Sequence, residues 1–293
     1  MMDLSVRDFT QGLPRDGALP TPAPGQVWTV TVNGENKGAV LIASVRGIVV
    51  TAWPVTPLRA AVAPAFIVRL ESFNSEALVV WPEAEFGLTR AALGCSLGAP
   101  LTAKQVEGVA RAAAADIDTP LNVEMCSTLE TEEALDALDQ ACLYAWDLGA
   151  WVWPSAEQGA GVLDEEILSA SGVDAERLGK DLSLRCGTAR LMFEGNLIPD
   201  LDQLRTLADQ GVDVDSVLRP PSGSEVEALT DPRHKDKVTS LAAVRNMDES
   251  TARSMIWEQA VGTAARQTVG RDPIREAHEK IDAILQKLLK LCD

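Results

Sequence analysis

Two segments of this sequence carry side chains suited to binding or reacting with another molecule. In the segment 183–197, Arg185 and Arg190 stand among small, polar and apolar residues, and a guanidinium group suits a guanine edge or a phosphate. In the segment 54–59, Thr56 is a hydroxyl candidate at the end of a strand-like run, with Arg59 close to it in sequence. A threonine in that place is ordinarily a turn residue, so both interpretations of Thr56 stay open.

Other kinds of site are poorly supplied. The chain has two histidines, His234 and His278, too few to favour a histidine-built metal site or a serine-type triad. Its five cysteines are scattered and never form a CxxC pair. No Walker loop or nucleotide-binding glycine fingerprint is present. The basic cluster 233–235 is interpreted as a solvated turn. We therefore expect no metal and no cofactor.

Composition excludes several classes of protein. The 293 residues carry a formal charge of −17, with 46% apolar and 24% charged residues, the balance of a folded protein. The acidic sum argues against broad, sequence-independent phosphate binding, although it permits a small local contact with DNA. No apolar run is long enough to span a bilayer, and the N-terminus lacks the features of a signal peptide. We expect a cytoplasmic protein with reduced thiols and no membrane partner.

The first half of the chain is predicted to be mainly β. Residues 1–21 are expected to form an extended arm, because 13–25 is rich in proline and glycine. Short Val- and Ile-rich runs at 26–32, 39–45, 47–53, 65–70 and 77–81 predict five strands, and a helix follows Thr102. Together they indicate a small curved barrel with a C-terminal helix over 22–118. Residues 119–161 then read as an acidic helical linker, since 119–162 carry eight acids and no base.

The second half is predicted to be all helical. Apolar spacings and turn residues indicate five short helices within 162–220, followed by a helical tail over 221–293. In the tail, Asp272 and Pro273 are expected to begin a helix. Apolar residues at 3-4 spacing then form a heptad seam over 274–291. This seam packs either on its own chain or on a second copy, as a homodimer.

The five-helix segment resembles the Xre/Cro-like helix-turn-helix family. In that family the second helix of the motif enters the major groove of DNA. The resemblance covers about a fifth of the chain, and it rests on Leu178-Gly179, Leu182-Ser183, Thr188, Met192, Gly195, Pro199, Leu201, Gln203-Leu204 and Leu207-Ala208. It implies that the outward positions, where an operator or a protein partner would bind, are Arg185, Gly187, Thr188, Arg190, Leu191, Phe193 and Asn196. Leu191 and Phe193 stand where the family usually has polar side chains, which suits a protein partner.

The N-terminal part has a second resemblance, to the PemK/MazF-like toxin fold. Its matching places are Pro24-Gly25, Val27-Trp28, Pro54-Val55-Thr56 and Leu101-Thr102. Those toxins are endoribonucleases with an SH3-like barrel, so the resemblance implies an RNA site with Thr56, Lys37 and Arg59 as catalytic candidates. Lys37 stands roughly where the family has an arginine, and a lysine lacks the planar fork that grips a phosphate. The barrel is therefore expected to be depleted of catalytic groups.

These observations predict an α+β multidomain chain with a regulatory function. We expect a prokaryotic protein that binds DNA or a protein partner through residues 183–197, with the barrel as a binding or autoregulatory module. Two alternatives remain open. One is an active endoribonuclease with a fused control domain, and the other is an adaptor that uses the acidic stretch 119–162 to occupy a basic surface.

Overall fold

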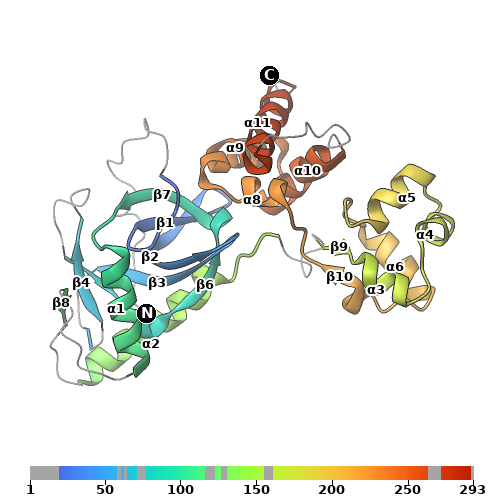
Figure 1. Cartoon of the computed structure of the whole chain (residues 1–293). Helices are drawn as coiled ribbons and strands as arrows, with labels where there is room; N and C mark the ends of the chain where they lie inside the picture. The colour runs from blue at the N-terminus through green and yellow to red at the C-terminus, as the bar shows by residue number, and fades with distance from the viewer. Residues whose placement is uncertain are drawn as a thin grey trace. The chain divides into compact units, whose positions relative to one another are not determined.

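The computed structural model describes residues 20–57, 61–62, 65–70, 77–115, 123–126, 131–154, 161–262 and 272–291. The chain divides into two compact units. Unit 1 comprises residues up to Val152 together with Thr230–Lys235, and unit 2 comprises Trp153–Leu229 and the residues from Asp236 onward. Unit 1 is built around a sheet and unit 2 is mostly helical (Figure 1), which confirms the predicted α+β class. Most of the predicted N-terminal arm lies outside the described residues.

The described part of unit 1 contains one antiparallel sheet. Its strands are β1 (Val27–Val32), β2 (Glu35–Arg46), β3 (Val49–Pro57), β4 (Phe66–Arg69), β5 (Ala77–Val80), β6 (Phe86–Thr89), β7 (Leu93–Gly98) and β8 (Glu124–Met125). Neighbouring strands follow the order β7-β1-β2-β3-β5-β4-β8, and β6 pairs with β3. All five predicted strands are present. The predicted barrel is not closed within the described residues, because β7 and β8 are the two ends of this pairing path.

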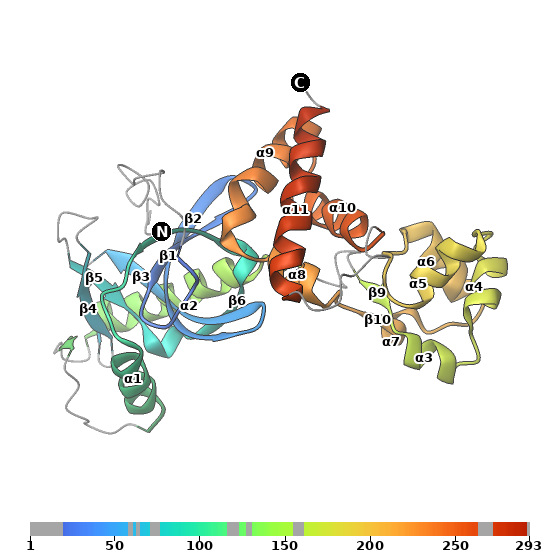
Figure 2. The same cartoon turned by 45° about the horizontal axis from the view of Figure 1, so that its top comes forward.

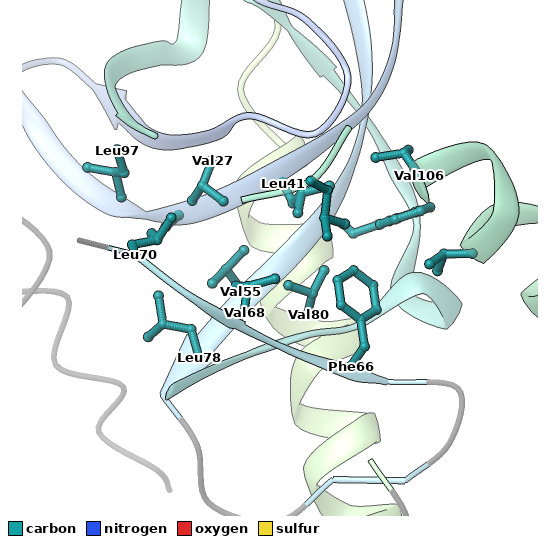
Figure 3. Close-up of a cluster of buried hydrophobic side chains, with 14 residues drawn as sticks. Val27, Leu41, Val55, Phe66, Val68, Leu70, Leu78, Val80, Leu97 and Val106 are labelled. Atoms are coloured by element: carbon teal, nitrogen blue, oxygen red, sulfur yellow. The ribbon is translucent and has the colours of Figure 1, made fainter. Parts of the chain in front are cut away.

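Both faces of the sheet are apolar, since alternate residues of a strand point to opposite sides. One face is covered by α1 (Ala103–Ala115). Figure 3 shows the side chains that meet there, among them Val27, Leu41, Val55, Phe66, Val68, Leu78, Val80 and Val106. The alternate positions, such as Trp28, Val40 and Ala52, lie in a second cluster on the other face. That second face therefore needs a cover of its own.

The cover is α2 (Glu132–Gly149), which the sequence interpretation placed in a linker. Thr131 begins the helix by accepting a hydrogen bond from the backbone N–H of Ala134. One side of α2 then presents small buried residues to the sheet, namely Ala134, Ala137, Ala141, Ala145 and Leu148. The linker assignment of 119–161 is thus wrong for α2, because the helix belongs to the core of unit 1.

A short segment from the second half of the chain also belongs to unit 1. The ammonium group of Lys235 donates hydrogen bonds to the backbone oxygens of Thr31, at 2.6 Å, and Ala91, at 2.9 Å. Nearby, Arg90 and Asp231 form an ion pair at 3.3 Å with both side chains largely buried. The expectation of a solvated turn at 233–235 is therefore wrong for His234 and Lys235, which are buried, while Arg233 is exposed. The predicted tail domain 221–293 is interrupted by these residues.

Unit 2 begins with five short helices, as predicted (Figure 2). They are α3 (Glu165–Ala170), α4 (Ala175–Asp181), α5 (Cys186–Phe193), α6 (Leu201–Asp209) and α7 (Val214–Val217). They enclose a core of Leu163, Leu168, Val173, Leu178, Met192, Leu207, Val212 and Val217. Strands β9 (Val162–Leu163) and β10 (Leu218–Arg219) pair with each other, so the segment enters and leaves at one place.

The remaining helices are α8 (Ser224–Leu229), α9 (Lys235–Arg245), α10 (Glu249–Gly262) and α11 (Pro273–Lys290). Asp272 caps α11 as predicted, accepting from the N–H of Ile274. The middle of the predicted heptad seam, including Ala277, Ile281 and Leu288, is buried, and α11 packs on α8 and α10. The structure thus favours the intramolecular alternative for this seam, and a homodimer through 274–291 stays a prediction.

Candidate partner-binding surface

The segment that carries the first candidate site is a pair of helices joined by a short turn. Helix α4 begins at the cap Asp174, and the residues 182–185 connect its end to α5. Ser183 adopts a left-handed backbone with φ of 54°, a conformation that few non-glycine residues adopt. The N–H of Leu184 donates to the carbonyl of Gly179 at 2.8 Å. This tight turn reverses the chain between α4 and α5.

Small residues hold the two helices close together. A Cβ atom placed on Gly179 would lie 3.1 Å from the Cβ of Ala189, so a larger residue in α4 would push α5 outward. Ala189 and Met192 are buried, and Met192 packs with Leu178 in the core of the five-helix segment. One side of α5 is thereby fixed inward, and the opposite side faces solvent.

The solvent side of α5 contains most of the predicted binding residues. Arg185, Gly187, Arg190 and Leu191 are exposed, and a Cβ on Gly187 would meet no atom within 4 Å. The Arg190 side chain is 73% exposed and bonds to Glu194 at 2.7 Å, one helical turn away. Arg185 makes no ion pair within the described residues. This part of α5 is open to a partner.

Three of the predicted binding residues are less accessible. Thr188 and Asn196 are half-buried. Phe193, expected to project outward, packs against the core of the five-helix segment, so that expectation is wrong. The reason is helical geometry, since Phe193 lies four residues after Ala189 and therefore on the same side of α5. Leu191 is the large apolar residue exposed on this side of α5.

The electrostatics of this surface are nearly balanced. The hydrogen bond to Glu194, together with its negative charge, raises the pKa of Arg190. On α4, Lys180 bonds to Glu176 at 2.8 Å, and this bond and charge raise the pKa of Lys180. Sequence reasoning missed Glu194 as the partner of Arg190, although the i,i+4 spacing of opposite charges signals such a pair. A partner competes with Glu194 for Arg190.

The second candidate site comprises the predicted catalytic residues of unit 1, Thr56, Lys37 and Arg59. Thr56 lies in β3 and is buried, and its hydroxyl oxygen accepts a hydrogen bond from the indole N–H of Trp81 at 2.8 Å. Lys37 is exposed at a bulge of β2 and pairs with Glu35 at 2.6 Å. Lys37 and Thr56 share no hydrogen bond within the described residues, and Arg59 lies outside them. A catalytic site formed by Thr56, Lys37 and Arg59 therefore stays a prediction, while the described contacts of Thr56 and Lys37 are to Trp81 and Glu35.

No group of histidine, cysteine, aspartate or glutamate residues that could hold a metal ion occurs in the part of the chain that the structure describes. None of the described helices is long and apolar enough to cross a membrane. No model of a protein family matches the chain, and no curated protein or solved structure shows significant similarity to it.

Proposed function

We propose that this chain is a regulatory DNA-binding protein, in which α4 and α5 act as a helix-turn-helix and α5 reads the major groove. The observation that carries the proposal is the open side of α5. Arg185, Arg190 and Leu191 are exposed there, and the opposite side of the helix is packed inward through Ala189 and Met192. A reading helix needs this combination, because base edges are contacted by side chains held at fixed spacing on a rigid element.

The chemistry of the open side supports contact with a duplex. Arg185 and Arg190 can each donate two hydrogen bonds to a guanine or bind a phosphate. Gly187 stands between them and has no side chain to hold the helix away from the groove. The open side of α5 offers two cations, so the DNA-binding constant should depend weakly on salt. For two neutralised phosphates the slope of log K against log salt is about −2.

A protein partner is the second candidate function, and Leu191 favours it. This leucine is an exposed large apolar residue beside the Arg190–Glu194 pair. An apolar residue ringed by charges is a common arrangement in protein interfaces. The same side of α5 would then bind another protein in place of DNA.

Unit 1 is proposed to act as a binding or autoregulatory module. The resemblance to an endoribonuclease fold names Thr56 as its hydroxyl, and the burial of Thr56 beneath Trp81 supports a structural role for this residue. In this proposal α5 of unit 2 contacts the DNA, and unit 1 supplies a binding or autoregulatory surface that is distinct from α5.

The test is a selection of DNA from a random duplex pool by the full chain, followed by polarisation titrations of the enriched sequence. Arg185→Ala and Arg190→Ala should each weaken binding by roughly tenfold or more, because each removes a contact to a base or phosphate. Arg205→Ala is the matched control, since Arg205 is 76% exposed and paired with Asp202 much as Arg190 is paired with Glu194. Its affinity should equal that of the wild type.

Two outcomes would contradict the proposal. The first is that no sequence is enriched at any salt concentration. The second is that Arg205→Ala weakens binding as much as Arg190→Ala does, which would indicate a general charge effect. Loss of a specific co-purifying protein on Leu191→Ser, with no DNA bound, would establish the second candidate.

A further inference from the structure

The outer side of α2 carries large apolar residues that the protein leaves in solvent. Trp146 is 76% exposed, and Leu135 and Leu143 are also exposed. Leu135, Asp139, Cys142 and Trp146 follow one another at spacings of four, three and four residues, so they form one row along the helix. Leu143 lies beside this row. Exposed tryptophan is rare unless it is used, because leaving so large a ring in water forgoes its burial energy.

Acidic side chains lie within and around this row. Glu132, Glu133, Asp136, Asp139 and Asp147 are all exposed on the same helix, and no lysine or arginine occurs in it. The pKa of the Cys142 thiol is raised from its ordinary value. Partial burial is the main cause, and the negative charges of Asp139 and Glu83 add to it. Glu83 comes from the loop before β6, so the negative field is not confined to α2.

We infer that this side of α2, called here the acidic apolar surface, is a docking site for a basic amphipathic segment of another protein. A partner helix that places apolar residues at 3-4 spacing would cover Leu135, Cys142 and Trp146. Lysine or arginine residues on its flanks would meet the carboxylates. Charge complementarity favours a basic partner, since α2 exposes five carboxylates and contains no lysine or arginine.

A second copy of this chain fits the surface poorly. Two such helices would bring ten carboxylates together without a compensating base on either helix, and like charges at close range oppose association. The chain as a whole also carries a charge of −17. The inference does not depend on the DNA-binding proposal, because the acidic apolar surface belongs to unit 1 and α5 to unit 2.

The experiment measures binding of a synthetic peptide to the full chain by fluorescence anisotropy. The probe is a labelled leucine–lysine peptide of about fifteen residues, with leucine at 3-4 spacing, long enough to form a helix on binding. Trp146→Ala should raise the Kd by more than about tenfold, as expected for a large aromatic anchor of an interface. Leu201→Ala is the control, because Leu201 is 66% exposed on α6 in the other unit, and it should leave the Kd within about twofold of wild type.

Two further measurements separate docking from general attraction to an acidic protein. A peptide with glutamate in place of lysine should not bind. The double variant Asp136→Asn, Asp139→Asn should weaken the lysine peptide at low salt and flatten its salt dependence. All of these positions are exposed, so the thermal unfolding of the variants should match that of the wild type, which checks that the fold is intact.

Three outcomes would overturn the inference. One is equal affinity of Trp146→Ala and wild type for the lysine peptide. Another is comparable binding of the glutamate peptide. The third is a concentration-dependent dimer in light scattering that Trp146→Ala abolishes, which would assign the surface to a second copy of the chain.

Discussion

Tyr144 provides a direct test of how α2 sits on the sheet. It is the only tyrosine in the sequence, and its phenol oxygen accepts a hydrogen bond from the backbone N–H of Ala39 at 3.1 Å. The ring lies over Gly38 so closely that a Cβ on this glycine would be 1.3 Å from the phenol oxygen. Burial raises the pKa of Tyr144 to about 12, against the smaller lowering effect of the Ala39 hydrogen bond.

The magnitude follows from linkage between ionisation and folding. The ordinary pKa of a tyrosine is 10.0, so the folded protein holds the phenol proton about two pH units longer than the unfolded chain. Each pH unit corresponds to about 1.36 kcal/mol, which makes about 2.7 kcal/mol in total. The sign is that of a raised pKa. The contribution is fully present below pH 10 and is lost as the pH rises through 12.

The assay is a spectrophotometric titration of phenolate absorbance in the near ultraviolet. In the native protein the phenolate should appear near pH 12, and in urea near pH 10. Tyr144→Phe is the control, because it removes the phenolate absorbance. Its free energy of unfolding should fall less between these two pH values than that of the wild type. A native titration near pH 10 would refute the packing described for α2. It would also remove the basis for the acidic apolar surface, which depends on that orientation.

Three further substitutions test the packing described above by urea unfolding. Gly38→Ala should destabilise unit 1 by about 3 kcal/mol or more, because the added methyl group overlaps the phenol ring and φ is +151° there. Thr56→Val should cost about 1–3 kcal/mol by leaving the buried indole N–H of Trp81 without its acceptor. If Thr56→Ser keeps this stability, RNA cleavage by that variant and by wild type can be compared without a folding artefact. Arg253→Met should cost about 3–5 kcal/mol, because it leaves the carboxylate of Glu249 buried with its ion pair broken; an unchanged unfolding midpoint would contradict this.

The secondary structure could be predicted well where the apolar period was clear. The run 26–32 became β1, and the helix expected after Thr102 became α1. Strands β6 and β7 were missed, because Phe86–Thr89 is short and Leu93–Gly98 contains two glycines, which weaken the strand pattern. What local patterns could not provide was the partner of each face. Strands with apolar residues at both odd and even positions signal two covered faces, but only the structure identifies α2 as one of the covers.

The candidate sites show the same division between local and tertiary information. Arg190 was correctly placed on an exposed helix side, because helical spacing decides which residues face outward. The sequence could not distinguish Thr56 from a catalytic hydroxyl. The indole that bonds to it belongs to Trp81, which follows β4 and β5 along the chain. The burial of Lys235 could not be predicted from the sequence for the same reason. Its two carbonyl partners, Thr31 and Ala91, are far away in the sequence.

The distribution of charge bears on whether an acidic chain can bind DNA at all. At physiological salt a charge is screened over about 8 Å, so the net value of −17 acts on a bound duplex only through residues near the contact. At α5 those residues are Arg185, Arg190 and Glu194, a local sum of one positive charge. On α2 the exposed residues sum to a strongly negative value with no base. The two surfaces therefore favour partners of opposite charge. The acidic residues of α2 repel a phosphate backbone, and a basic protein segment gains little electrostatic attraction at α5. Binding of both partners at once would thus depend on local side chains and not on the charge of the whole chain.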